Sequence, residues 1–96
     1  MLEIKESENG QIALVGRLDA AQSEKARLFF ENIRSPITLD CANLEFISST
    51  GLGVLLILQK RVMQAGGAVR LTNVSRDIHN VFRYTGLDGF FDFEIA

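Results

Sequence analysis

Apolar and polar residues alternate with a period of two near the N-terminus, which predicts two β-strands. Leu2 and Ile4 alternate with polar neighbours over residues 2–6, and residues 11–15 form a second apolar run. Between them, Glu8-Asn9-Gly10 contains the Asn-Gly pair typical of tight hairpin turns. We therefore predict that the first two strands form a β-hairpin.

The rest of the chain alternates between helical spacing of apolar residues and short runs typical of strands. Pro36, Gly66-Gly67 and Gly86 supply the signals that end helices. Strand–helix–strand units require parallel pairing with right-handed crossovers. We predict an α/β domain with a small mixed β-sheet and helices packed mainly on one face. The helices are expected over about residues 20–33, 50–65 and 76–85, and the strands over 37–41, 68–72 and, at the edge, 90–95.

The first predicted helix has a clear start and a narrow apolar stripe. Asp19 can cap it, and Gln22 three residues later completes a capping-box pattern. The stripe is centred on Leu28, Phe29 and Ile33, which we expect to face the core.

Length and charge limit the classes of protein to which the chain can belong. With 96 residues, we expect one domain over residues 1–96. Ten Lys and Arg stand against twelve Asp and Glu, a net charge of −2, so no basic surplus attracts nucleic acid or an anionic membrane. The N-terminus lacks a signal-peptide pattern, and no apolar run approaches the roughly 20 residues of a membrane span. We therefore expect a cytoplasmic protein.

Cys41 and His79 are the single cysteine and the single histidine of the sequence. One cysteine cannot form an intrachain disulfide, and a zinc site of the usual Cys and His spacing is absent. We expect Cys41 in the core, His79 on an exposed helix face, and neither a metal nor a cofactor.

Three consecutive hydroxyl residues, Ser48, Ser49 and Thr50, stand between a buried strand and a strongly apolar helix. A helix start leaves four backbone N–H groups unpaired, and a Ser or Thr side chain there can accept from them. The same end carries the positive pole of the helix dipole, so it also favours an added phosphate. At least one of the three is expected to cap the helix, and Ser49 is the candidate for a phosphorylation switch.

A serine between a strand and a helix is also the arrangement of a hydrolase nucleophile. However, residues 47–51 lack the Gly-x-Ser-x-Gly frame, and the one candidate base, His79, lies on another predicted helix. A phosphate-binding Gly-x-x-x-x-Gly-Lys-Ser/Thr loop is absent too. We therefore predict that the protein is not an enzyme.

The segment over residues 44–53, Leu-Glu-Phe-Ile-Ser-Ser-Thr-Gly-Leu-Gly, resembles the signature of the STAS domain, the fold of anti-sigma-factor antagonists. Residues 16–19, Gly-Arg-Leu-Asp, are similar to the family's Gly-x-Leu-Asp turn. Residues 66–68 and 85–87, with Phe90-Phe91, also fall where the family has similar segments. The resemblance spans nearly the whole chain.

The resemblance implies a partner-switching module. The unphosphorylated antagonist binds an anti-sigma-factor serine kinase (a GHKL-type ATPase) and so releases a sigma factor. Phosphorylation by that kinase breaks the complex, and a serine phosphatase resets it. The phosphoacceptor maps onto Ser49, with Thr50 second. The implied partner-binding residues are Asp19, Ser48, Ser49, Thr50, Gly51 and Leu52.

At Ser48 the sequence departs from the family pattern, which has an acid before the phosphoacceptor. The missing carboxylate removes a contact that a kinase can use, and it also removes like-charge repulsion against a phosphate. These effects oppose each other. A second hypothesis therefore stays open, a STAS adaptor in a sensory or transport complex without a phosphoswitch. Gly51 and Gly53 each disfavour the first helical turns by roughly 1 kcal/mol, which close packing or a partner's close approach would explain.

Overall fold

The computed structural model describes residues 1–7 and 10–96. Glu8 and Asn9 of the predicted turn lie outside the described residues, whereas the antiparallel hairpin that they connect is confirmed. The elements, with η denoting short 3-10 helices, are β1 (Leu2–Glu6), β2 (Gln11–Leu18), η1 (Ala20–Gln22), α1 (Ser23–Phe30), β3 (Ile37–Ile47), α2 (Ser49–Gln64), β4 (Val69–Val74), α3 (Arg76–Tyr84), η2 (Asp88–Phe90) and β5 (Asp92–Ile95).

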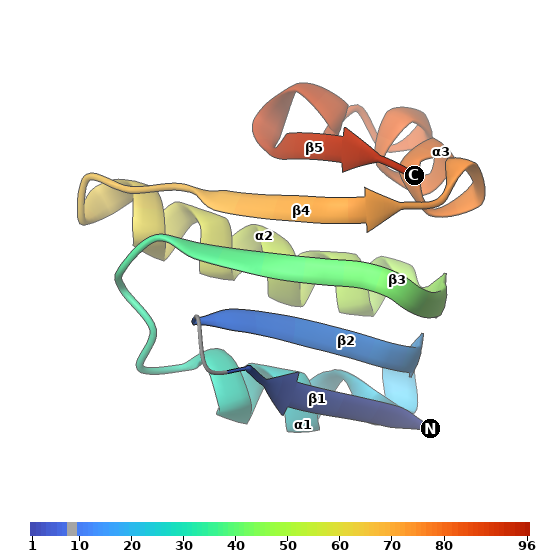
Figure 1. Cartoon of the computed structure of the whole chain (residues 1–96), viewed down its shortest axis with the longest axis horizontal. Coiled ribbons are helices and arrows are strands. Elements are labelled where there is room, and N and C mark those ends of the chain that lie inside the picture. The colour runs from blue at the N-terminus through green and yellow to red at the C-terminus, as the bar shows by residue number, and fades with distance from the viewer. Residues whose placement is uncertain (8–9) are drawn as a thin grey trace.

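The five strands form one mixed sheet in the order β1-β2-β3-β4-β5 (Figure 1). β1 and β2 pair antiparallel, and the three pairs from β2 to β5 are parallel. A helix returns the chain between each pair of parallel neighbours, as parallel pairing requires. The predicted mixed α/β architecture, including the edge strand β5, is confirmed.

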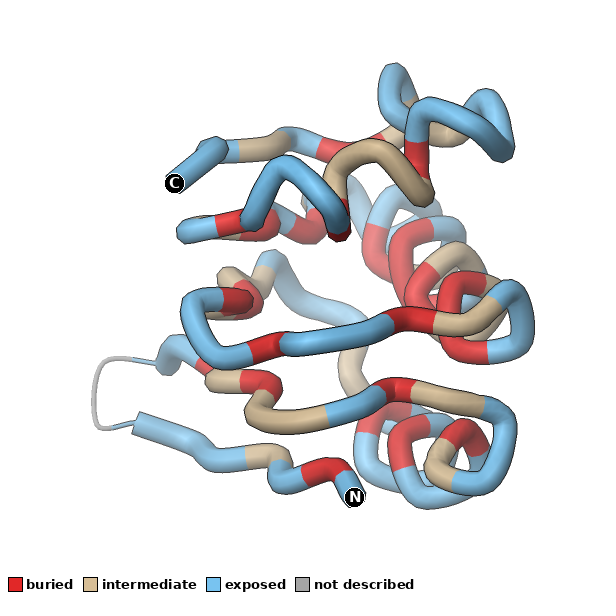
Figure 2. Tube along the Cα trace, turned by 90° about the vertical axis from the view of Figure 1, so that its right-hand side faces the viewer, coloured by how far each residue is buried: buried red, intermediate tan, exposed pale blue. Residues whose placement is uncertain are grey.

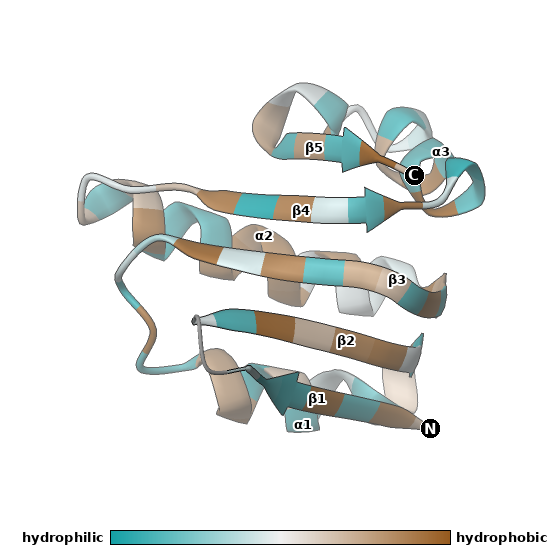
Figure 3. Cartoon of the chain, in the orientation of Figure 1, coloured by the Kyte–Doolittle hydropathy of each residue, from teal (hydrophilic) through white to brown (hydrophobic). Residues whose placement is uncertain are grey.

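α1 and α2 lie side by side against one face of the sheet (Figures 1 and 2). The strand residues on that face are buried, among them Leu14, Leu39 and Leu71. Polar residues alternate with them along β3 and β4 (Figure 3), and Arg70 forms an ion pair with Glu94 across the opposite face. We call this opposite side the open face. The face that α1 and α2 cover is thus the apolar one that forms the core.

The first helix differs from its prediction in length and in its buried side. A 3-10 turn precedes α1, which ends at Phe30, and the buried residues are Ser23, Ala26 and Phe30. Leu28 is 52% exposed and Phe29 37% exposed, so the prediction that they face the core was wrong. Ile33, the third residue of the predicted stripe, lies beyond the end of α1 and packs partly buried against the core. Small side chains at 23 and 26 leave room for the sheet, and Phe30 fills the space beyond them.

Two single residues were predicted with different success. Cys41 is buried in the core, as expected, and desolvation raises the pKa of its thiol to about 12. His79 is half-buried rather than exposed, because its ring packs edge-on against Phe93 at a centroid distance of 4.8 Å.

Gln59 is a buried polar residue that joins three elements. Its Nε2 donates to the Phe90 carbonyl at 2.7 Å, and its Oε1 accepts from the Val69 N–H at 2.7 Å. One side chain of α2 therefore supplies a hydrogen-bond partner to a backbone group of η2 and to a backbone group of β4.

We expect Gln59→Leu to lower the free energy of unfolding by about 2 kcal/mol, because it leaves the buried Val69 N–H and the partly buried Phe90 carbonyl without partners. Denaturant unfolding measures the change. Gln64→Leu, on an exposed position of the same helix, is the matched control and should shift stability by less than about 0.5 kcal/mol. Equal effects of the two variants would contradict the role given to Gln59.

Candidate functional site

The candidate site lies where two neighbouring parallel strands end. Leu18 of β2 pairs with Ile47 of β3, so Asp19 and Ser48, which follow them, emerge at the same edge of the sheet. The Ser48 N–H donates to the Leu18 carbonyl at 2.9 Å, and the Ser48 hydroxyl approaches the same oxygen at 3.4 Å. The start of α2 is therefore fixed to the end of β2.

Ser48 is the residue that caps α2. Its backbone is extended, and its Oγ accepts from the Gly51 N–H at 3.1 Å. The Leu52 N–H donates to the Ser48 carbonyl at 2.8 Å, which begins the helical hydrogen bonds. The expectation that one of the three hydroxyl residues caps the helix is confirmed. The position that carries an acid in the family pattern thus holds a neutral cap.

Ser49 and Thr50 are the first two residues of α2, and both are exposed. Because Ser48 serves as the cap, the Ser49 hydroxyl is not needed for that purpose. It is presented to solvent at the positive end of a 16-residue helix. This geometry leaves Ser49 accessible to a modifying enzyme.

Gly51 and Leu52 are buried directly beneath the exposed hydroxyl residues. A Cβ built on Gly51 would lie 2.4 Å from the Leu18 carbonyl oxygen and 2.7 Å from Leu18 Cγ. Packing against β2 therefore explains this glycine. At Gly53 a Cβ would meet nothing within 4 Å, so packing does not explain it.

Asp19 acts as an N-cap, as the sequence predicts, although the helix that it caps is η1. Its Oδ1 accepts from the Gln22 N–H at 3.1 Å, and the Ser23 hydroxyl donates to its carbonyl at 2.8 Å. Its Oδ2 lies 3.7 Å from the Nε of Arg17. The predicted contact of Asp19 with a partner stays a prediction.

Sequence reasoning did not single out Arg17 and Phe46, which border the site. They are register partners on β2 and β3, and the Arg17 guanidinium carbon lies 4.3 Å from the centroid of the Phe46 ring. Arg17 occupies the variable position of the Gly-x-Leu-Asp segment, so the motif gave no signal for it.

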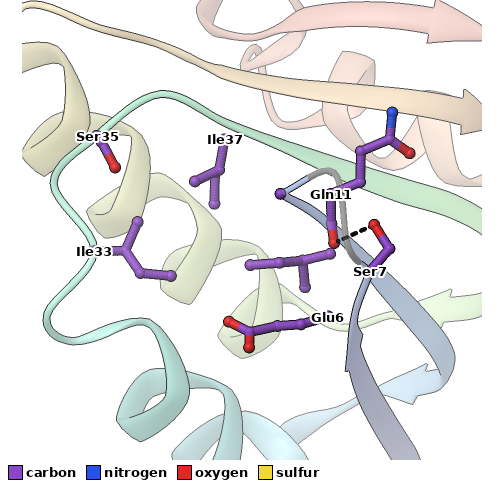
Figure 4. Close-up of a pocket in the computed structure, with 8 residues that line it drawn as sticks. Glu6, Ser7, Gln11, Ile33, Ser35 and Ile37 are labelled. Atoms are coloured by element: carbon purple, nitrogen blue, oxygen red, sulfur yellow. Dashed lines mark hydrogen bonds between the residues drawn. The ribbon is translucent and has the colours of Figure 1, made fainter.

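A cavity of about 360 Å³ lies away from these residues, near the start of β2 (Figure 4). Glu6, Gln11, Ile33 and Ile37 are among its lining residues. Asp19 follows the far end of β2, so this cavity is not part of the candidate site.

The described part of the chain lacks two features that define other classes of protein. Within residues 1–7 and 10–96, no three His, Cys, Asp or Glu side chains gather to hold a metal ion. No helix in these ranges has both the length and the apolar character needed to cross a membrane. The fold and the site define a small α/β domain whose candidate functional surface is a polar helix start.

Comparison with known proteins assigns this domain to a family. Residues 3–95 match the model of the STAS domain. An anti-sigma F factor antagonist of Paenibacillus polymyxa is 31% identical over 81 residues, covering 79% of this chain and 69% of that protein. An anti-sigma-B factor antagonist of Bacillus subtilis (strain 168) is 26% identical over 95 residues, covering 95% and 87%.

The fold is also shared with a solved structure, that of the Bacillus cell fate determinant SpoIIAA in its phosphorylated form. The TM-score is 0.71 at 19% identity, covering 100% of this chain and 93% of that chain. The chain belongs to the STAS domain family, which confirms the resemblance seen in the sequence.

Proposed function

We propose that this protein is an anti-sigma-factor antagonist controlled by phosphorylation of Ser49. Unphosphorylated, it binds an anti-sigma-factor serine kinase of the GHKL type, and phosphate on Ser49 releases it. A serine phosphatase restores the binding form. The observation that carries the proposal is that Ser48 caps α2, so the Ser49 hydroxyl at the start of the helix is exposed and not needed as a cap.

Three physical points support a phosphate at this position. A phosphoserine adds about −1.5 to −2 charges and three acceptor oxygens at the end of the helix where its dipole favours them. Ser48 is neutral, so it does not repel that phosphate. Ser49 is exposed, so the modification does not require unfolding of the core.

The relatives support the class of function. Two are named as anti-sigma factor antagonists, and SpoIIAA has been solved in a phosphorylated form. Together with the net charge of −2, they favour a protein partner over nucleic acid or a membrane surface. We place the switch in the cytoplasm and assign the protein itself no catalysis.

A STAS adaptor without a phosphoswitch is the second candidate, and Ser48 is the observation that favours it. A kinase that recognises an acid before its target serine would find a hydroxyl here. In that case Ser49 would be an exposed helix residue without a regulatory role.

Phosphate transfer in a native lysate of the source cells distinguishes the two candidates. With wild-type protein as bait and ATP added, we expect a GHKL-type kinase to bind and phosphate to appear on Ser49, as located by mass spectrometry. Ser49→Ala should retain the kinase and take up no phosphate, whereas Thr50→Ala should be labelled like wild type. A bound partner that leaves both Ser49 and Thr50 unmodified would favour the adaptor.

A further inference from the structure

Arg17 and Phe46 form an exposed cation–aromatic pair beside the candidate site. The side chain of Arg17 is 50% exposed, and Phe46 is 38% exposed although it is a large apolar residue. The guanidinium carbon lies 4.3 Å from the ring centroid, within the range of a cation–π contact. We call these two residues the Arg17–Phe46 pair.

The Arg17–Phe46 pair is continuous with the candidate site but lies on the open face of the sheet. The next residues along the strands, Leu18 and Ile47, are buried on the side covered by helices. Arg17 and Phe46 are exposed instead, so they point to the opposite side. One step further along each strand the chain reaches Asp19 and Ser48, at the ends of β2 and β3 in Figure 1.

The guanidinium of Arg17 is held in place without a close partner for its charge. Among the described residues, its one ion pair is to Asp19, with 3.7 Å between Nε and Oδ2, which is longer than a hydrogen bond. The other oxygen of that carboxylate accepts from the Gln22 N–H as a cap. The guanidinium carbon lies over the Phe46 ring, and among the described residues the N–H groups of the guanidinium donate no hydrogen bond, so they can meet an acceptor of a partner.

We infer that the Arg17–Phe46 pair extends the partner-binding surface from the start of α2 onto the open face, where it binds a carboxylate of the anti-sigma kinase beside an apolar side chain. The inference rests on the proposed function, since it assigns the chemistry of that same partner. A planar guanidinium matches a carboxylate with two parallel hydrogen bonds. Arg and aromatic residues also dominate the binding energy of protein interfaces.

Charge reversal at Arg17 tests this inference. The probe is the purified kinase recovered with the wild-type bait, and its dissociation constant is measured by calorimetry at low and moderate salt. Arg17→Glu should weaken binding by about tenfold or more, because like charges then face each other. Phe46→Ala should weaken it by about tenfold through loss of the apolar contact and of the cation–π contact that holds the Arg17 guanidinium. Melting curves of both variants check that the domain is folded.

Lys5→Glu is the matched control. Lys5 also lies on an exposed position of the sheet, but it pairs with Ala13, towards the end of β2 away from the site. The charge change is the same, and we expect less than about a threefold change in affinity. Raising the salt concentration should weaken wild-type binding more than Arg17→Glu binding, since the exposed pair is screened.

The outcomes separate this inference from the proposed function. Loss of binding by Ser49→Asp together with unchanged binding by Arg17→Glu would overturn the inference and leave the switch standing. Equal losses by Arg17→Glu and Lys5→Glu would also overturn it, because a general charge effect explains them. If no kinase binds the wild-type protein, the proposed function is wrong, and so is the inference that the Arg17–Phe46 pair binds a carboxylate of that kinase.

Discussion

Ser49→Asp is expected to weaken binding of the kinase by about 30-fold or more. An unpaired charge placed in an interface costs about 2–5 kcal/mol, mostly through its lost hydration. Ser49 is exposed at the first position of α2, so a partner that covers this helix start must cover the new carboxylate. Titration of the kinase with each variant measures the loss.

The same substitution should leave the fold intact. A carboxylate in the first turn of a helix interacts favourably with the helix dipole, and the cap at Ser48 is untouched. Ser35→Asp is the matched control, because Ser35 is also exposed but lies just before the start of β3, whereas Ser49 follows its end. Retention of the kinase by both aspartate variants would remove Ser49 as the control point and favour the adaptor hypothesis.

Two alanine substitutions two residues apart in α2 are expected to change stability in opposite directions. Gly51→Ala should lower the free energy of unfolding by about 3 kcal/mol, because its Cβ would collide with the carbonyl oxygen and the Cγ of Leu18. Backbone atoms of β2 cannot move away without breaking the hydrogen bond from the Ser48 N–H. Denaturant unfolding of both variants measures the difference.

Gly53→Ala should instead raise the free energy of unfolding by about 0.5–1 kcal/mol, because alanine is the better helix former and its Cβ meets open space. The kinase titration then tests the second explanation of this glycine. If Gly53→Ala is more stable but binds the kinase more weakly, the glycine serves the close approach of a partner. If Gly53→Ala is less stable than the wild type, the expectation that its Cβ enters open space is wrong.

The capping positions and the parallel pairing of the strands could be predicted from the sequence, because capping follows local residue types and the alternation of strands with helices requires parallel pairing. Asp19 accepts the hydrogen bond expected of a capping residue, and so does one of the three hydroxyl residues, Ser48. Gly66 and Gly86, which follow helices, have the positive φ angles that such ends favour. Once helices alternate with strands, parallel pairing follows, and five strands have few arrangements left.

The pairing register of the strands and the buried side of α1 could not be predicted from the sequence, because tertiary packing decides both. In α1, Ala26 and Phe30 are buried in place of the more conspicuous Leu28 and Phe29. β3 continues to Ile47, beyond the predicted end at residue 41, because its pairing with β2 continues through two register shifts.

The sequence predicted the location of the site, but it did not predict which of the three hydroxyl residues caps α2. The three hydroxyl residues were identified, but the backbone angles that make Ser48 the cap depend on the hydrogen bond of its N–H to Leu18. The pairing of Arg17 with Phe46 depends on a register shift in the same strands, so nothing in the linear sequence places them together.

The strand order of the sheet has a consequence for synthesis on the ribosome. Each strand pairs with the one made just before it, so no early segment waits for the C-terminus to find its partner. The start of α2 needs β2 and β3, and both have emerged before α2 itself is complete. The surface around Ser49 can therefore begin to form while the last third of the chain is still being translated.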